Sequence, residues 1–277
     1  MLYGNCISFK NLQHVKILKE TGFDYAETAL SPMYAAAKPE IEDFSGALEQ
    51  SGIECMAANV LFPGDIRLTG EKAEPQKAGD YIGEIFEKTK GLKFKIVVFG
   101  SGGARKVPEG FSKESAIEQI AGLIEAHLLP AAEKYGFVLA IEELNRGETN
   151  ILNSLGECIN LAKRANSPKV GLLADLYHIG LENDDIALLP KHKEMLAHCH
   201  IANPINSRFY PHEGDEAGAL YEKFFSGLKS AGYGGGLSIE GSLGFHAADA
   251  SVPDWVSAEN KQFYAESKKS LEYIKSF

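Results

Sequence analysis

The sequence has few cysteines, and none of them lies in a CxxC pair. The four thiols belong to Cys6, Cys55, Cys158 and Cys199, which are scattered singly along the 277 residues. This spacing excludes a zinc finger and gives no framework for a small disulfide-bonded protein. We therefore interpret the cysteines as reduced thiols, which in most proteins are buried as small apolar side chains.

Long apolar runs and an excess of basic residues are absent as well. No uncharged apolar stretch reaches the length of a membrane span, and the N-terminus lacks the continuous apolar segment of a signal peptide. The chain carries 28 Lys and Arg against 38 Asp and Glu, a formal net charge of -10. Because nucleic-acid binders need a basic face, this balance opposes binding to DNA. We expect a cytoplasmic protein with no nucleic-acid or membrane partner.

The sequence does contain a regular alternation of β-rich and amphipathic segments, with no Pro/Gly/Ser-rich linker between them. The β-rich segments cover residues 3–8, 23–30, 53–62, 94–100, 137–144, 170–178, 196–202 and 236–241. Glycine precedes several of these segments, where the C-terminus of a helix would turn back toward a sheet. These glycines are Gly22, Gly52, Gly91, Gly136 and Gly232.

Eight strands alternating with helices fit a (β/α)8 barrel better than a doubly wound sheet, which has fewer strands and exposed edges. A barrel of this kind takes about 250 residues as a single unit. We therefore predict an α/β fold that consists of one TIM-barrel domain over residues 1–277. In such barrels the active site lies at the C-terminal ends of the strands.

Four consecutive predicted strands end in a side chain that can bind a metal ion. Side-chain alternation points Glu142, Asp175, His200 and Glu240 into the mouth of the barrel. Taken alone, each acid is explained as well by helix capping or by pairing with Arg146. Clustered carboxylates repel one another, however, unless a cation lies between them. Three carboxylates and one imidazole suit Mn²⁺, Mg²⁺ or Co²⁺, and Zn²⁺ stays open.

The motifs around these four residues resemble those of a known family. "IEELNRGE", "LADLYHI", "HCHIAN" and "LSIEG" are similar to motifs of the xylose isomerase-like barrel superfamily, most closely its D-tagatose 3-epimerase and D-psicose (allulose) 3-epimerase branch. The similarity is specific from about Val138 to Gly241. The N-terminal half matches only through "GFDYAE" and the order of strands.

This resemblance implies a metal-dependent sugar isomerase or epimerase, most directly a ketose 3-epimerase that works through an enediolate. Glu142 and Glu240 would remove and return the proton next to a metal-bound carbonyl. The implied ligands of one divalent ion, Mn²⁺ before Mg²⁺, Co²⁺ or Zn²⁺, are Glu142, Asp175, His200 and Glu240. The implied contacts to a sugar or sugar-like substrate are Glu148, His178 and Arg208. Relatives often associate, so a homodimer or a homotetramer is expected.

Two departures from the family pattern leave the sugar open. Residues 211–214 read Pro-His-Glu-Gly instead of Pro-Gly-x-Gly, and the segment between His200 and Arg208 is longer than in the branch named above. A dehydratase of the inosose or 3-dehydroshikimate type would use a similar metal set, which the four ligands do not distinguish. An endonuclease IV-like phosphodiesterase would need further histidines, which the strand ends "AANVLFP" and "VVFGSG" lack.

A glycine-rich loop, "GSGGARK", follows the fourth predicted strand at Gly100. Its backbone amides could cradle a phosphate, with Arg105 and Lys106 adding charge. A plain flexible loop is the better-supported interpretation, because this glycine pattern is common in loops.

Other polar residues lie near the same strand ends. Glu27 and Asn59 end the second and third strands, where each could contact a substrate or make a structural hydrogen bond. His198 points inward one layer below the predicted histidine ligand, and we interpret it as a hydrogen-bonded core histidine. His212 and His246 are expected in loops near the mouth.

Overall fold

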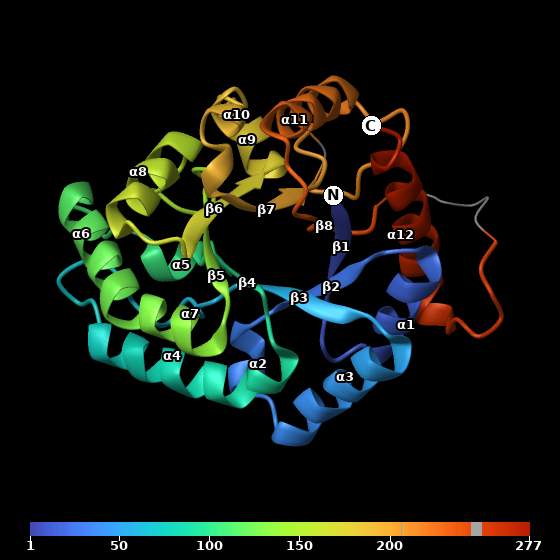
Figure 1. Ribbon diagram of the computed structural model, residues 1–277, viewed down its shortest axis with the longest axis horizontal. Coiled ribbons are helices and arrows are strands. Elements are labelled where there is room, and N and C mark those ends of the chain that lie inside the picture. The colour runs from blue at the N-terminus through green and yellow to red at the C-terminus, as the bar shows by residue number, and fades with distance from the viewer. Residues whose placement is uncertain (206, 245–250) are drawn as a thin grey trace.

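Eight parallel strands form a closed barrel in the computed structural model, which describes residues 1–205, 207–244 and 251–277 (Figure 1). They are hydrogen-bonded in chain order, and β1 closes the ring by pairing with β8. The predicted (β/α)8 fold is therefore confirmed. The strands are β1 (Leu2–Ile7), β2 (Tyr25–Ala29), β3 (Glu54–Asn59), β4 (Ile96–Phe99), β5 (Val138–Glu142), β6 (Val170–Asp175), β7 (Leu196–Ile201) and β8 (Gly236–Ile239).

Helices surround the ring of strands (Figure 1). The α-helices are α1 (Leu12–Thr21), α2 (Ser31–Ala35), α3 (Lys38–Ser51), α4 (Pro75–Thr89), α5 (Gly102–Arg105), α6 (Lys113–Leu123), α7 (Leu129–Tyr135), α8 (Leu155–Ala165), α9 (Leu176–Glu182), α10 (Leu188–Lys191), α11 (Gly218–Ala231) and α12 (Lys261–Ile274). Short elements are η1 (Lys90–Leu92), η2 (Ile124–Leu128, a π-helix), η3 (Lys193–Met195) and η4 (Ala258–Asn260). Within the described ranges, no helix is long and apolar enough to cross a membrane.

Most of the predicted glycine turns are left-handed helix caps. The helices α1, α3, α7 and α11 each end on a glycine with positive φ, at Gly22, Gly52, Gly136 and Gly232. The prediction is wrong at Gly91, which lies inside the short helix η1, because Lys93 adopts the left-handed conformation there instead. Glycine is favoured at such positions because a Cβ atom strains a left-handed backbone.

One part of the barrel interior is apolar. Val98, Ala140 and Leu173, from the neighbouring strands β4, β5 and β6, form a small buried cluster. Ala140 and Leu173 precede Glu142 and Asp175 by two positions, so they share the face of their strand with these acids. The last residues of β5 and β6 therefore stand above an apolar layer. A much larger core packs elsewhere around the barrel and its helices.

Another part of the interior is occupied by the ring of Tyr25. A Cβ atom on Gly4 would lie 2.2 Å from that ring, and one on Gly236 would lie 2.5 Å from Met56 Cε and 2.7 Å from the Tyr25 oxygen. Glycine at these two positions of β1 and β8 therefore makes room for the ring. The Tyr25 hydroxyl hydrogen-bonds to Ser238 Oγ at 2.8 Å, which begins a series of polar contacts toward the mouth.

Alanine should have opposite effects on stability at a glycine that caps a helix and at a glycine inside a helix. Gly136 has φ +83° and no atom within 4 Å of an added Cβ, whereas Gly83 lies exposed inside α4 with equally open space. Gly136→Ala should destabilise the protein by roughly 1 kcal/mol, and Gly83→Ala should stabilise it by a similar amount. Thermal unfolding should show midpoints displaced in opposite directions, by about 2–4 °C each. Shifts of the same sign would contradict the assigned cap.

Candidate functional site

The four predicted metal ligands converge at the C-terminal ends of adjacent strands. Glu142 and Asp175 are the last residues of β5 and β6, His200 lies in β7, and Glu240 follows β8. One ligand atom from each lies within 4.8 Å of the others. The first three side chains are buried and Glu240 is half-buried. The structure thus brings together all four residues that the strand pattern pointed into the mouth.

The atoms that face the centre of this cluster are electron-pair donors. His200 Nδ1 lies 3.3 Å from Glu142 Oε1 and 3.2 Å from Glu240 Oε2. Among the described residues, neither His200 Nδ1 nor Glu142 Oε1 has a hydrogen-bond partner, although both atoms are buried. Buried polar atoms are normally satisfied, and a divalent cation bound between these atoms would satisfy both of them. Three carboxylates and one imidazole fit a divalent ion.

The charge of the cluster leads to the same conclusion. Burial raises the pKa of Glu142, and the nearby carboxylate of Glu240 raises it further. Burial also raises the pKa of Asp175, and Arg208 only partly opposes this effect. The protein's own cations therefore do not fully balance the negative charges of Glu142 and Asp175. A bound divalent ion would supply the positive charge that favours their ionised forms.

Glu240 differs from the other two acids because cations lie close to it. Burial opposes its ionisation, but His200 and Arg208 lower the pKa of Glu240 to about 2. Asn59, the last residue of β3, donates from Nδ2 to Glu240 Oε1 at 2.6 Å. Of the two interpretations open for Asn59, the structure therefore gives a hydrogen bond that holds an acid of the cluster.

Asp175 is held by contacts on both sides. Its Oδ1 accepts a hydrogen bond from the Tyr177 backbone N–H at 2.8 Å, at the start of α9. Its own N–H donates to Glu143 Oε1 at 2.9 Å. Glu143 is buried and lies next to Glu142, and burial raises its pKa well above the usual value. Glu142, which ends β5, thus belongs to the cluster, and Glu143, which follows it, connects this end of β5 to β6.

The predicted substrate residues His178 and Glu148 are joined by Asn145. The Asn145 backbone N–H donates to His178 Nδ1 at 3.1 Å, which leaves the proton of a neutral ring on Nε2, 3.5 Å from Asp175 Oδ2. Asn145 Nδ2 donates to Glu148 Oε1 at 3.1 Å. Sequence reasoning gave Asn145 no role, although it stands inside the recognised motif.

The third predicted substrate residue, Arg208, lies across the cluster. Its Nη2 hydrogen-bonds to Glu240 and lies 3.3 Å from Asp175 Oδ2, while Nη1 lies 3.5 Å from Glu148 Oε1. The guanidinium also stacks over the ring of Tyr177 at 4.7 Å. Arg208 therefore links two acids of the cluster to one of the predicted substrate contacts. A quarter of its side chain is exposed, so it faces the mouth.

Arg105 and Gly100, in the loop after β4, support the cluster, whereas Gly103 and Lys106 of this loop are exposed. Arg105 is completely buried, donating from Nη1 to the Phe99 carbonyl at 3.0 Å and from Nη2 to the Glu142 carbonyl at 2.8 Å. It is therefore unavailable to a phosphate, contrary to the interpretation that its charge could help bind one. A Cβ on Gly100 would lie 2.0 Å from Glu142 Oε2. Glycine at this position gives the Glu142 carboxylate its space.

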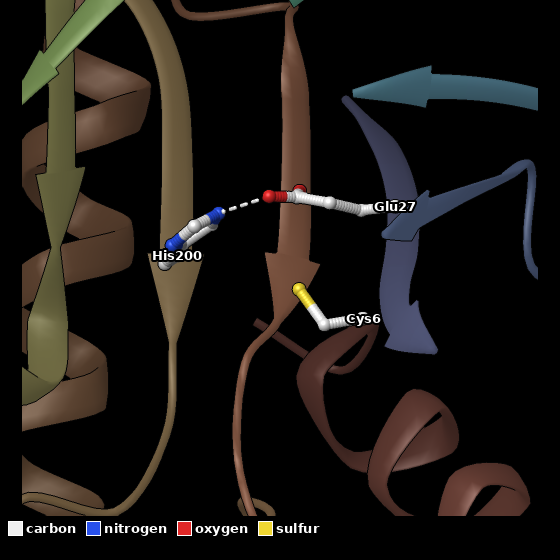
Figure 2. Close-up of side chains that lie close together, drawn as sticks. All are labelled: Cys6, Glu27 and His200. Carbon is white, nitrogen blue, oxygen red and sulfur yellow. Dashed lines mark hydrogen bonds and ion pairs between the residues drawn. The ribbon is translucent and has the colours of Figure 1, made fainter. Parts of the chain in front are cut away.

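Glu27 lies beneath the cluster instead of lining the mouth. It is fully buried, and its oxygens contact His198 Nε2 at 2.8 Å and His200 Nε2 at 2.9 Å. Figure 2 shows Glu27 pointing from β2 toward His200, with Cys6 beside them. Burial alone would raise the pKa of Glu27, but the two histidines hold it well below its usual range. The interpretation of His198 as a hydrogen-bonded core histidine is supported by this contact.

Two further histidines were expected in loops near the mouth. His212 lies half-buried before α11, where its Nδ1 is 3.0 Å from the Glu213 carbonyl oxygen. His246 lies outside the described residues.

The barrel and its cluster of carboxylates and imidazole define an α/β-barrel protein with a candidate metal centre at the carboxyl ends of its strands. Residues 15–255 match the family described as "xylose isomerase-like TIM barrel". The chain belongs to this family.

Curated relatives of the chain are sugar epimerases. It is 30% identical over 114 residues to the 3-dehydro-D-guloside 4-epimerase of Escherichia coli (strain K12). This aligned region covers 40% of this chain and 41% of that protein. It is 23% identical to the ketose 3-epimerase of Arthrobacter globiformis over 82% of this chain and 75% of the relative. The first alignment thus covers less than half of the relative's length.

Solved structures of similar fold include two epimerases. The D-psicose 3-epimerase of Clostridium cellulolyticum H10, determined with D-tagatose, superposes with a TM-score of 0.79 at 17% identity, over 100% of this chain and 99% of the other. The 3-keto-D-glucoside 4-epimerase of E. coli gives a TM-score of 0.76 at 21% identity and covers both chains fully. At these identities the structures establish the fold.

The close approach of Gly100 to Glu142 predicts that a side chain at position 100 weakens metal binding. Gly100→Ala should displace the Glu142 carboxylate and weaken Mn²⁺ binding by about tenfold or more, the range typical of changes next to a ligand. Gly103→Ala is the matched control, because its added Cβ would lie no closer than 3.5 Å to another atom. Isothermal titration calorimetry of metal-stripped protein measures both affinities. Equal affinities in the two variants would show that the close approach of Gly100 does not constrain Glu142.

Proposed function

We propose that this protein is a divalent-metal-dependent sugar epimerase, most directly a ketose 3-epimerase. The observation that carries the proposal is the convergence of Glu142, Asp175, His200 and Glu240 at the mouth of the barrel. Two sugar epimerases among the curated relatives support the reaction class. We treat residues 1–277 as one domain that binds a small sugar or sugar-like molecule.

The four converging side chains would hold one divalent ion. Mn²⁺ is the favoured ion, and Mg²⁺, Co²⁺ and Zn²⁺ are also compatible with three carboxylates and one imidazole. When bound, the ion supplies Lewis-acid stabilisation of negative charge on a substrate oxygen. Such stabilisation is needed because the proton next to a ketone is too weakly acidic to leave otherwise.

Glu142 and Glu240 are the proposed acid and base. They come from β5 and from the end of β8, and His200 Nδ1 lies between them at 3.3 and 3.2 Å. One of the two carboxylates would accept the proton and the other would return one. Epimerisation needs both, on opposite faces of the reacting carbon.

Substrate orientation is assigned to the side chains around the pair. His178 presents Nε2–H and Arg208 presents its guanidinium, so both offer hydrogen-bond donors to sugar oxygens. Glu148 is the proposed acceptor, since its side chain is 41% exposed at the mouth. Asn145 positions His178 and Glu148 relative to each other. The stacking of Arg208 on Tyr177 would limit the conformations of the guanidinium.

A second candidate is a 4-epimerase that acts on a 3-keto sugar glycoside. The relative that is 30% identical over 114 residues is a 3-dehydro-D-guloside 4-epimerase. Both reactions remove a proton next to a ketone and differ in which carbon carries it. A dehydratase of the inosose or 3-dehydroshikimate type begins with the same proton removal, whereas an endonuclease IV-like activity is disfavoured by the net charge of -10.

The proposal also covers the setting of the protein. Its net charge of -10 disfavours nucleic acid as a partner. A cytoplasmic location, the absence of a membrane partner and assembly as a homodimer or homotetramer stay predictions.

Solvent deuterium exchange distinguishes these reactions. Protein reloaded with Mn²⁺ is incubated in D₂O with free and phosphorylated ketoses and with 3-keto-glycosides. The sugars are then freed of metal and examined carbon by carbon by NMR. Deuterium at C3 of a ketose, together with the epimer, is the expected result. Glu142→Gln and Glu240→Gln should each slow exchange by about a hundredfold or more, because each removes a proton-transfer group.

The other outcomes assign the alternatives. Exchange at C4 of a 3-keto-glycoside would favour the 4-epimerase, and exchange at C1 or C2 would indicate an aldose-ketose isomerase. An absence of exchange with every sugar, in protein that demonstrably holds its metal, would contradict the epimerase proposal. The dehydratase substrates would then be tested by following loss of water.

A further inference from the structure

A second polar layer lies directly beneath the proposed metal centre. It consists of Glu27 and Tyr25 from β2, His198 from β7 and Ser238 from β8, all buried. Glu27 is the hub of this layer, because its two oxygens contact three other side chains. Oε1 lies 2.9 Å from His200 Nε2, and Oε2 lies 2.8 Å from His198 Nε2 and 2.6 Å from Ser238 Oγ.

The strand register explains how Glu27 reaches this place. Tyr25 and Glu27 alternate with Ala26, so they share the interior face of β2. The pairing of β2 with β3 shifts between Ala26 and Glu27, since Ala26 pairs with Cys55 and Glu27 with Ala57. Irregularities of this kind occur beside active sites, where they redirect a side chain. β2 and β8 lie on the two sides of β1. The Glu27 side chain thereby extends past β1 and contacts residues of β8 and β7.

We infer that Glu27 is a positioning residue that fixes the orientation and proton arrangement of His200, leaving Nδ1 free to bind the metal. This inference rests on the proposed metal site, although the contact between Glu27 and His200 does not. An ionised carboxylate accepts hydrogen bonds and cannot donate them, so the ring nitrogen that faces it must carry the proton. The proton therefore lies on His200 Nε2, and the lone pair of a neutral ring is on Nδ1.

Ser238 adds a third hydrogen-bonding contact to the Glu27 carboxylate. Ser238 Oγ donates its proton to Glu27 Oε2, so it accepts the hydrogen bond from the Tyr25 hydroxyl at 2.8 Å. Ser238 and the two histidines thus direct donors toward one carboxylate, and Tyr25 donates to Ser238. Metal-binding histidines commonly donate their second N–H to a carboxylate in this way, which orients the ring and raises its basicity.

A purely structural role would not require this charge. An ionised carboxylate in the interior is costly unless several hydrogen bonds satisfy it, and apolar side chains of similar volume often serve stability as well or better. Here the charge is directed at the nitrogen of His200 opposite to the one that faces Glu142 and Glu240. The arrangement therefore fits control of a metal ligand better than filling of the core.

A second metal ion at this level is the competing interpretation. Cys6, Glu27 and His200 also bring potential ligand atoms within 4.8 Å of one another (Figure 2). The 2.9 Å separation of Glu27 Oε1 and His200 Nε2, however, is already that of a hydrogen bond, and Cys6 Sγ lies 3.5 Å from Asn59 Nδ2 as an acceptor. These three side chains are therefore engaged with each other and with Asn59, and we expect one metal ion per chain.

The first test uses wild-type protein and needs no metal. With ¹⁵N-labelled histidine, NMR should show protons on Nε2 of His198 and His200 that exchange slowly with water, because both are buried and donate to Glu27. Loading with diamagnetic Mg²⁺ or Zn²⁺ should leave the His200 proton on Nε2 and shift the Nδ1 resonance. A His200 proton found on Nδ1 alone in the metal-free protein, or Nε2 as the metal-shifted nitrogen, would overturn the inference.

The second test uses variants and calorimetry with Mn²⁺. Glu27→Gln should weaken Mn²⁺ binding by about ten- to a hundredfold, because it removes the charge and one of the two acceptors. Ser238→Ala is the matched control, since it also removes a hydrogen bond to Glu27 but leaves the contact with His200. The expected stoichiometry is one ion per chain. Equal affinity in wild type and Glu27→Gln, or two ions per chain, would contradict the inference.

The two proposals can fail separately. If wild-type protein binds no Mn²⁺, the proposed function fails, whereas the proton positions measured in metal-free protein still decide the role of Glu27. If Mn²⁺ binds and a sugar is epimerised while the His200 proton is not on Nε2, the metal site stands and the role of Glu27 is wrong.

Discussion

The mutual repulsion of three carboxylates at one end of the barrel is the constraint on which the surrounding structure depends. Glu142, Asp175 and Glu240 are held within 4.8 Å of one another and of His200, where burial raises the pKa values of the first two. Neighbouring groups either hold these acids or oppose their charge. Arg208 lies across the mouth, Asn59 donates to Glu240, and the buried Arg105 donates to the Glu142 backbone. Such crowding of acids is unfavourable for folding alone, and it fits the proposed bound cation.

The polar residues that form this centre were predictable because each one ends a strand. Side-chain alternation decides which residues of a strand face inward, and the parallel barrel places all strand ends at one rim. Glu142, Asp175, His200 and Glu240 therefore follow from local patterns alone. The same logic explains the acidic sequence after Leu139, where Glu142 faces the mouth, Glu143 accepts from the Asp175 N–H, and Glu148 lies at the rim beside Arg208.

The supporting contacts were not predictable, because they join residues that are distant in the chain and do not follow from periodicity. Glu27 reaches His200 across two strands, and its aim depends on a shift in the pairing of β2 with β3. A charged residue in a glycine-rich loop is expected to be exposed. Arg105 instead points inward and donates to the carbonyls at the ends of β4 and β5. Gly100 shows why glycine is required at that one position of the loop, since any side chain there would meet Glu142.

The most direct test of this account is to locate the metal itself. Anomalous diffraction from crystals grown with Mn²⁺ should show one strong peak per chain, bonded to Glu142, Asp175, His200 Nδ1 and Glu240. Arg208 should then have withdrawn from the two acids that it contacts, since the ion would take over their charge. A peak beside Cys6 and Glu27 instead, or none within reach of these four side chains, would contradict the central claim that they form one metal centre.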